Sequence, residues 1–431
     1  MKKRWMRRIC LALTLITALS CTACGKTETP AAAFQPRLDT QAQVELQAAG
    51  FLGNFEALDQ VINNFNEYYP NVSVHYESNG SDSLREYLNN NPQIDFFMTA
   101  ERNVRYPGWE ERYVADYCAD LSGEDIDLSA YQEKVLDACK VNGKLVRLPL
   151  GLSLNGMVVN KTLLEKEGLK LPTNYPEFLS VLESLKEKGY TPIQGASNAV
   201  YTYLIENMAL YTLEKENLVD ALNQGESSAV DALEPVFERL NTILDKGYTD
   251  PAINDTYPED NYDGAILRFF EGDVPFWVCD TEKVSGMKKR ESKSEAFTAN
   301  PFDYQFALIP MGDEGAFAYV EPWYGFSLNK NSTNYDYALE FLRFLSTSDQ
   351  LNTMASVKGI PTAGTDDSAD IRYEKVVDTA KAGVFYADET VREHMKSFLT
   401  NAAKSLAEGT AATPRDAAQE YADSCAALRD E

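Results

Sequence analysis

The apolar positions in the first part of the chain change their spacing several times. Residues 44–48 alternate as a strand does, and residues 58–65 then place four apolar side chains on one helical face. Alternation returns at 72–76, a helix is expected near 81–90, and the apolar run at 94–99 predicts a third strand. This β-α-β-α-β order predicts a parallel sheet covered by helices.

The alternation of strands and helices continues through the rest of the chain. Short apolar runs at 156–159, 275–278 and 304–309 predict strands. Asn174 is expected to cap a helix, and Thr413-Pro414 to begin the final helix. We therefore predict an α/β protein, which at 431 residues is long enough for two domains.

The first 25 residues have a different pattern. Five basic residues precede an apolar run at 9–19, and Cys21-Thr22-Ala23-Cys24-Gly25 follows. This pattern predicts a secretory signal peptide over 1–23. The small residues before Cys24 resemble the lipobox of bacterial lipoproteins, which implies cleavage before Cys24 and acylation of its thiol. An ordinary cleaved signal or a short membrane anchor is the alternative, and Cys21 is a second candidate for the lipid. Residues 24–40 are rich in Thr, Ala and Pro and predict a flexible tether.

Composition narrows the classes of function. The formal net charge of −26 repels polyanions and argues against a nucleic-acid partner. The chain holds only two histidines, His75 and His394, and shows no CxxC pair, Walker loop or GxGxxG motif, so we expect no metal, no cofactor and no Ser-His-Asp triad. Four widely spaced cysteines fit either disulfides or buried thiols, namely Cys118, Cys139, Cys279 and Cys425.

Six segments follow one another in order behind the signal. They are 55–74, 91–98, 146–161, 175–193, 269–276 and 325–361, the last ending in Gly359-Ile360-Pro361. Together they resemble the family 1 extracellular solute-binding proteins of bacterial ABC importers, which mostly take up sugars and oligosaccharides. The resemblance implies two α/β lobes of the type II periplasmic-binding-protein fold, joined by a hinge, with ligand in the cleft between them. We expect lobe 1 to hold 41–152 and 326–363, and lobe 2 to hold 153–325 and 364–431.

The resemblance also implies a function. The protein would capture a mono- or oligosaccharide without catalysis and deliver it to a membrane permease. It would act as a monomer on the outer face of the cell membrane, anchored there by the lipid on Cys24. A sensory or adhesive lipoprotein that uses the same fold for a non-sugar solute is one alternative. A secreted glycoside hydrolase is another, and it would need two carboxylates roughly 5–10 Å apart, drawn from Glu101, Asp280, Glu282 and Glu321.

A sugar site needs aromatic faces and planar polar side chains, which usually lie on loops after the carboxyl ends of strands. Trp323 is the strongest stacking candidate, with core packing beside the hinge as its alternative role. Relatives often have Gly-x-Trp where this chain has Asp280-Thr281-Glu282, so that stacking platform is missing. The other candidates are Asn54, Thr99, Glu101, Arg102, Ser153, Asn155, Asn198, Tyr201, Tyr203, Asp280, Glu282, Glu321 and Tyr324. Helix capping is the alternative role for Asn54, and core packing is the alternative for the tyrosines.

Overall fold

The computed structural model describes residues 34–80, 84–99, 116–197, 199–256, 262–365, 380–385 and 392–427. Cys24 and the rest of the expected signal, together with Glu101, Arg102 and Asn198, lie outside the described residues. Among the helices that the structure describes, none is long and apolar enough to cross a membrane. The chain from Pro36 onward forms one compact unit.

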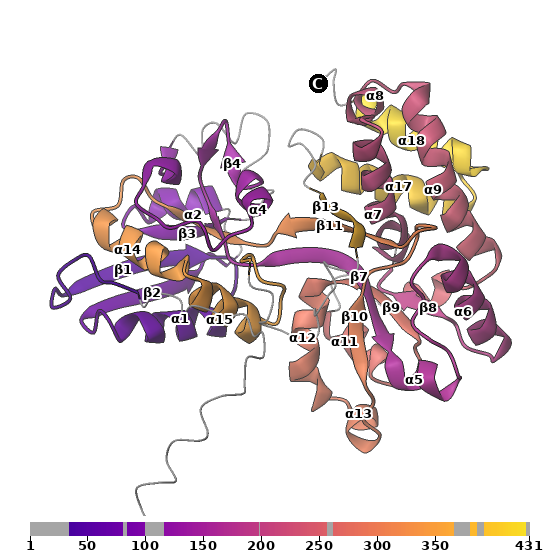
Figure 1. Ribbon diagram of the computed structural model, residues 1–431, viewed down its shortest axis with the longest axis horizontal. Coiled ribbons are helices and arrows are strands. Elements are labelled where there is room, and N and C mark those ends of the chain that lie inside the picture. Colours follow the sequence, from indigo (N-terminus) through magenta and orange to yellow (C-terminus); the bar gives the residue numbers. More distant parts are fainter. Residues whose placement is uncertain are drawn as a thin grey trace, which may run out of the picture. The chain divides into compact units, whose positions relative to one another are not determined.

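The first lobe is built on a five-stranded sheet (Figure 1). Its strand order is β2-β1-β3-β12-β6, with β1 parallel to both β2 and β3, and β12 antiparallel to β3 and β6. The predicted β-α-β-α-β unit is therefore confirmed. The strands are β1 Val44–Gly50, β2 Val72–Ser78, β3 Phe96–Thr99, β6 Leu148–Pro149 and β12 Gly325–Leu328. The helices are α1 Glu56–Asn66, α2 Leu84–Asn90, α4 Glu133–Asp137, α14 Tyr335–Leu345 and α15 Ser348–Lys358, with η2 Leu121–Gly123 and the hairpin β4 Lys140–Val141 and β5 Lys144–Leu145.

The second lobe is built on a six-stranded sheet. Its main path is β13-β11-β7-β9-β8, and β10 pairs with β7. The strands are β7 Leu152–Asn160, β8 Ile193–Gly195, β9 Phe276–Asp280, β10 Tyr304–Ala307, β11 Ala316–Pro322 and β13 Ala380–Phe385. The helices are α5 Lys161–Lys166, α6 Tyr175–Glu187, α7 Ala199–Lys215, α8 Val219–Asn223, α9 Ser227–Asp245, α10 Pro251–Asn254, α11 Tyr262–Phe269, α12 Thr281–Glu291, α13 Glu295–Ala299, α17 Arg392–Glu408 and α18 Pro414–Ala427.

Two neighbouring segments carry the chain between the sheets. Strand β6 is followed within two residues by β7, and β11 is followed by Trp323, Tyr324 and β12. Backbone hydrogen bonds join these crossings, from Leu150 N to Tyr324 O over 2.9 Å and from Trp323 N to Gly151 O over 2.8 Å. Beyond them, β7 and β11 lie side by side as an antiparallel pair (Figure 1). The lobe boundaries that we expect from the sequence fall at the start of β7 and of β12.

Helix ends show which local predictions hold. The Asn174 side chain accepts a hydrogen bond of 3.0 Å from Glu177 N and caps α6, as predicted. Thr413 likewise accepts from Asp416 N at the start of α18. Asn54 does not cap α1, because Phe55 occupies the cap position and supplies no side-chain hydrogen bond. The helix is held instead by its buried face of Ala57, Leu58, Val61 and Phe65.

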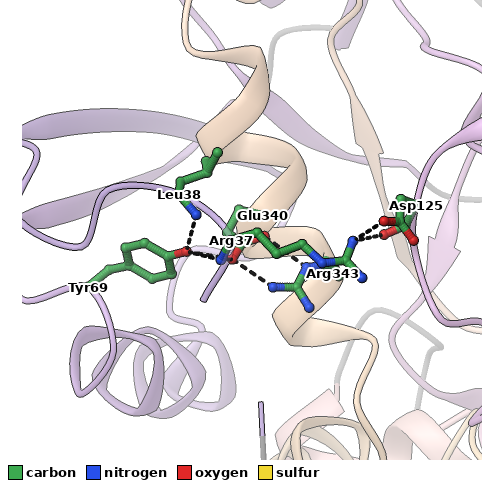
Figure 2. A network of polar contacts seen from close by, with 6 residues as sticks. All are labelled: Arg37, Leu38, Tyr69, Asp125, Glu340 and Arg343. Atoms are coloured by element: carbon green, nitrogen blue, oxygen red, sulfur yellow. Dashed lines mark hydrogen bonds and ion pairs between the residues drawn. The ribbon is translucent and has the colours of Figure 1, made fainter. Parts of the chain in front are cut away.

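Residues 36–40 belong to the folded unit, so the tether expected over 24–40 is too long at its end. Figure 2 shows the reason: Arg37 N donates to Tyr69 Oη over 3.1 Å and to Glu340 Oε1 over 2.9 Å. Leu38 N donates to the same Tyr69 oxygen. Arg343 forms two hydrogen bonds to the Glu340 carboxylate. The chain is therefore fixed to the first lobe before β1 begins.

The four cysteines in the described residues are buried free thiols. Of the two alternatives that their spacing left open, the structure therefore shows the thiols. Among the described residues, no group of three or more His, Cys, Asp or Glu side chains is placed to hold a metal ion.

Candidate ligand-binding site

Four aromatic rings gather where β1 ends and the second crossing passes. Phe51 and Phe55 come from the loop after β1, and Trp323 and Tyr324 come from the crossing between β11 and β12. The ring centroids of Trp323 and Phe55 are 6.2 Å apart in an edge arrangement, and those of Phe51 and Tyr324 are 5.7 Å apart. Trp323 is only 4% exposed, so it packs beside the hinge in this structure.

The second lobe contributes a carboxylate to this aromatic group. Trp323 Nε1 donates a hydrogen bond of 2.9 Å to Glu282 Oε1 in the first turn of α12. Asp280 begins that helix by accepting a bond from Lys283 N. The position where relatives often carry a Gly-x-Trp platform thus holds a carboxylate that binds the Trp323 indole. We call Phe51, Phe55, Glu282, Trp323 and Tyr324 the crossing cluster.

A row of hydrogen-bonded polar side chains crosses the second sheet beside this cluster. Tyr203 in α7 donates to Asp280 Oδ2 over 3.1 Å. Asp280 pairs with Asn155 in the ladder between β9 and β7, and Asn155 Nδ2 donates to Glu206 Oε2 over 2.5 Å. Three of the predicted site residues, Tyr203, Asp280 and Asn155, therefore lie in one row across β9 and β7.

The row continues to a cation from a distant part of the sequence. Lys396 Nζ in α17 lies 3.3 Å from Glu206 Oε1 and 2.9 Å from Glu321 Oε1, and 5.4 Å from the centroid of the Tyr319 ring. Glu321 also pairs with Ser153 in the ladder between β11 and β7, so Ser153 is the strand neighbour of a residue that binds the lysine. We call Tyr203, Asp280, Asn155, Glu206, Lys396 and Glu321 the polar strip.

The electrostatics of the strip keep its lysine charged. The Glu206 side chain is 1% exposed, whereas Lys396 is 38% exposed and Glu321 is 20% exposed. Burial raises the pKa of Glu206 above its ordinary value, although Lys396 opposes this shift. Burial also disfavours the charge of Lys396, but attraction to Glu206 and Glu321 raises its pKa well above the usual value. The ammonium therefore stays protonated between two carboxylates.

Asn207 holds the backbone beneath the strip. Its Nδ2 donates to Asn155 O and its Oδ1 accepts from Tyr319 N, each over 3.1 Å. Helix α7 is thereby bonded to both β7 and β11, the strands that approach the crossings. This amide fixes the two strands relative to the helix that carries Tyr203 and Glu206.

The remaining predicted residues lie elsewhere. Thr99 is fully buried, and its Oγ1 lies 3.2 Å from Ser327 Oγ within the first sheet. Tyr201 is 4% exposed in the core of the second lobe, where burial raises its pKa to about 12. Both side chains therefore take the packing role in this structure. Asn54 is exposed and lines a cavity between α1, α12 and α15.

Sequence reasoning missed Phe51, Glu206, Asn207 and Lys396. Glu206 had a visible signal, since it is a charged residue in a helix that buries eleven residues. A buried carboxylate in an apolar helix needs a partner. Lys396 had no comparable signal, because the groups that surround it come from α7 and β11.

The sequence is similar to that of known proteins. Residues 48–351 match the bacterial extracellular solute-binding protein family, and the chain belongs to this family. The multiple sugar-binding protein of Streptococcus mutans is 24% identical over 203 residues, which cover 46% of each chain. The match thus spans less than half the length of this curated relative.

Solved structures agree with the two-lobed α/β fold. A family 1 extracellular solute-binding protein from Bifidobacterium longum subsp. infantis has a TM-score of 0.65 at 15% identity, covering 90% of this chain and all of the other. The GacH receptor of Streptomyces glaucescens, solved unliganded and with acarbose, has a TM-score of 0.66 at 17% identity, covering 90% and 98%. At such identities these likenesses establish the fold alone.

Proposed function

We propose that this protein captures a carbohydrate in a cleft between its lobes, as a binding protein and not as an enzyme. The observation that carries the proposal is the meeting of the crossing cluster with the polar strip. Aromatic rings pack on the apolar faces of pyranoses, and carboxylates, amides and an ammonium bind hydroxyls. The sugar-binding relative in Streptococcus mutans and the acarbose complex of the GacH receptor support this ligand class.

The arrangement favours binding over glycoside hydrolysis. A hydrolase needs one protonated carboxylic acid and one free carboxylate facing the same bond. Here Glu321 pairs with Lys396, Asp280 caps α12 and accepts from Tyr203, and Glu282 accepts from Trp323. Each of these three acids is already engaged with a donor or cation of the protein, and a hydrogen-bonding carboxyl group suits the recognition of hydroxyls.

Thermal unfolding of the chain without its signal tests the ligand class. The panel contains mono- and oligosaccharides, with uronic acids and amino acids for contrast. A ligand at a hundredfold excess over its Kd adds about 2.7 kcal/mol to the free energy of unfolding. We expect one sugar class to raise the melting temperature. If amino acids raise it and every sugar leaves it unchanged, the carbohydrate assignment is wrong.

We further propose delivery to a membrane permease from an anchored position outside the cell membrane. Family membership and the lipobox-like residues before Cys24 support this location. Expression of the full chain and of Cys24→Ala, followed by fractionation, tests the anchor. The unchanged chain is expected with the membranes and the variant in the soluble fraction. Purification with a bound permease would separate an importer subunit from a sensory lipoprotein of the same fold.

A further inference from the structure

A cavity of about 230 Å³ lies between the first turn of α1, the middle of α12 and the end of α15. Among its lining residues are Asn54, Glu56, Lys289, Arg290 and Lys358. At about 30 Å³ for each molecule of liquid water, it has room for a carboxylate and part of the sugar ring that carries it. Two of its walls belong to the first lobe and one to the second.

Three cations and one carboxylate line this cavity, in a chain of formal net charge −26. Two of the cations already have acidic partners. Lys289 Nζ lies 2.7 Å from Glu56 Oε2, and Arg290 Nε donates to Asp263 Oδ1 over 2.6 Å. The lining thus carries three positive charges and one negative charge, and Asp263 beside it offsets the charge of Arg290.

Lys358 is the cation without such a partner. It makes no hydrogen bond or ion pair with the described residues, and its Nζ lies 5.2 Å from the centroid of the Trp323 ring. Burial lowers the pKa of its ammonium, and repulsion from Lys289 and Arg290 adds to the shift, against attraction from Glu282 and Glu56. A half-buried ammonium beside two other cations gains stability when an anion arrives.

The first turn of α1 supplies further groups that favour a nearby anion. Its cap residue Phe55 offers no side-chain acceptor, so the backbone N–H groups at this end are not capped by it. Such groups favour negative charge, and the amide of Asn54 stands on the same wall. Glu56 and Asp59 in the same turn already offset part of this preference, so the helix end does not define the site by itself.

We infer that this cavity binds an anionic group, a carboxylate or sulfate, carried by the carbohydrate ligand. The inference rests on the proposed carbohydrate function and names the ligand class more closely. Lys358 joins the cavity to the crossing cluster, since it lines the one and lies over the ring of Trp323 in the other. An anion there would contact α1 and α15 of the first lobe and α12 of the second.

Paired titrations test the inference on the chain without its signal. Glucuronic and galacturonic acid and their oligomers are titrated against their neutral counterparts, with sodium sulfate as the free anion. We expect a uronate to bind at least about tenfold more tightly than its neutral counterpart. Lys358→Met should remove that preference and leave the affinity for the neutral sugar within about twofold.

Two further variants keep the test decisive. Lys161→Met removes the same charge from an exposed position at the start of α5 and should change neither affinity. Glu56→Gln removes the one carboxylate of the lining and should tighten uronate binding, which reports on the cavity even if Lys358→Met folds poorly.

The outcomes separate the two proposals. Equal affinity for uronates and neutral sugars, or a uronate preference that survives Lys358→Met, overturns the anionic ligand while the carbohydrate function stands. Binding of sulfate that depends on Lys358, with no sugar bound, overturns the carbohydrate function and the assignment of the anion to a sugar. Failure of every probe overturns both.

Discussion

The indole Nε1 of Trp323 donates a hydrogen bond of 2.9 Å to Glu282 Oε1. Glu282 belongs to the second lobe. The same indole packs its ring against Phe55, which belongs to the first lobe. One side chain at the second crossing therefore touches the loop after β1 and the first turn of α12. Its removal should be felt both in the free energy of unfolding and in ligand affinity.

We expect Trp323→Ala to destabilise the protein by about 3 kcal/mol, because a nearly buried indole leaves a cavity. Trp323→Phe keeps most of the packing and should cost about 1 kcal/mol, mainly for the lost bond to Glu282. Denaturant unfolding and sugar titration measure the two effects. Tyr68→Ala, two residues beyond the end of α1, is the control, expected to lower stability without changing affinity. Equal loss of affinity in that control would show a general effect of unfolding.

Lys396→Met should destabilise the protein by about 3 kcal/mol, because it leaves the buried Glu206 carboxylate without its cation. Glu206→Gln together with Lys396→Met removes both charges and should recover most of that loss. A double-mutant cycle by denaturant unfolding measures the coupling. If the double variant is as unstable as the sum of the single variants, the ion pair is not the cause.

The same pair gives a dependence on pH. Because the folded-state pKa of Glu206 is raised above 4.5, the folded protein keeps this proton where the unfolded chain has lost it. The free energy of unfolding therefore falls as pH rises from the ordinary pKa of a glutamate, which the unfolded chain has, through the raised pKa of Glu206 in the folded protein. Lys396→Met should extend this fall to higher pH, since the ammonium that lowers the pKa of Glu206 is gone, and Glu206→Gln should abolish it. Unfolding curves from pH 4 to pH 8 test the sign.

Local sequence patterns predicted the first lobe well. The strands and helices of residues 44–99 alternate with spacings that neighbouring residues alone produce, and the Asn174 cap depends on contacts three residues away. Asn54 shows the limit of such predictions. It lies one residue before the cap position of α1, which Phe55 occupies, and so it does not cap the helix. Four residues of the polar strip were predicted, but its ion pair was not, because Glu206 and Lys396 are brought together by the packing of α7 against α17.

The network of Figure 2 predicts a loss of stability in acid. Burial by itself raises the pKa of Glu340, but hydrogen bonds from Arg343, Tyr69 and Arg37 N lower it overall. A lowered folded-state pKa contributes stability that is present above 4.5 and lost as pH falls through the lowered value. Glu340→Gln should therefore cost about 2 kcal/mol at neutral pH and less in acid. A constant difference across the pH range would show that the charge of Glu340 is not responsible.

Arg147 and Arg343 both carry nearly buried guanidinium groups in the first lobe, and they can be compared with each other. Arg147 is 2% exposed, and its Nη1 has no hydrogen-bond partner among the described residues. Its stem occupies the space beside Gly325, where a Cβ would lie 2.3 Å from Arg147 Cγ. Arg343, in contrast, binds Glu340 through two nitrogens. The two side chains thus differ in pairing more than in burial.

We expect Arg147→Met to leave the free energy of unfolding unchanged or to raise it by about 1–2 kcal/mol, because a buried charge with no ion-pair partner among the described residues is replaced by an apolar chain of similar length. Arg343→Met should lower it by about 3 kcal/mol, because the buried Glu340 carboxylate loses its cation. Denaturant unfolding of both variants at neutral pH measures the contrast. A loss from Arg147→Met as large as that from Arg343→Met would show that the charge of Arg147 contributes to stability and would overturn this contrast.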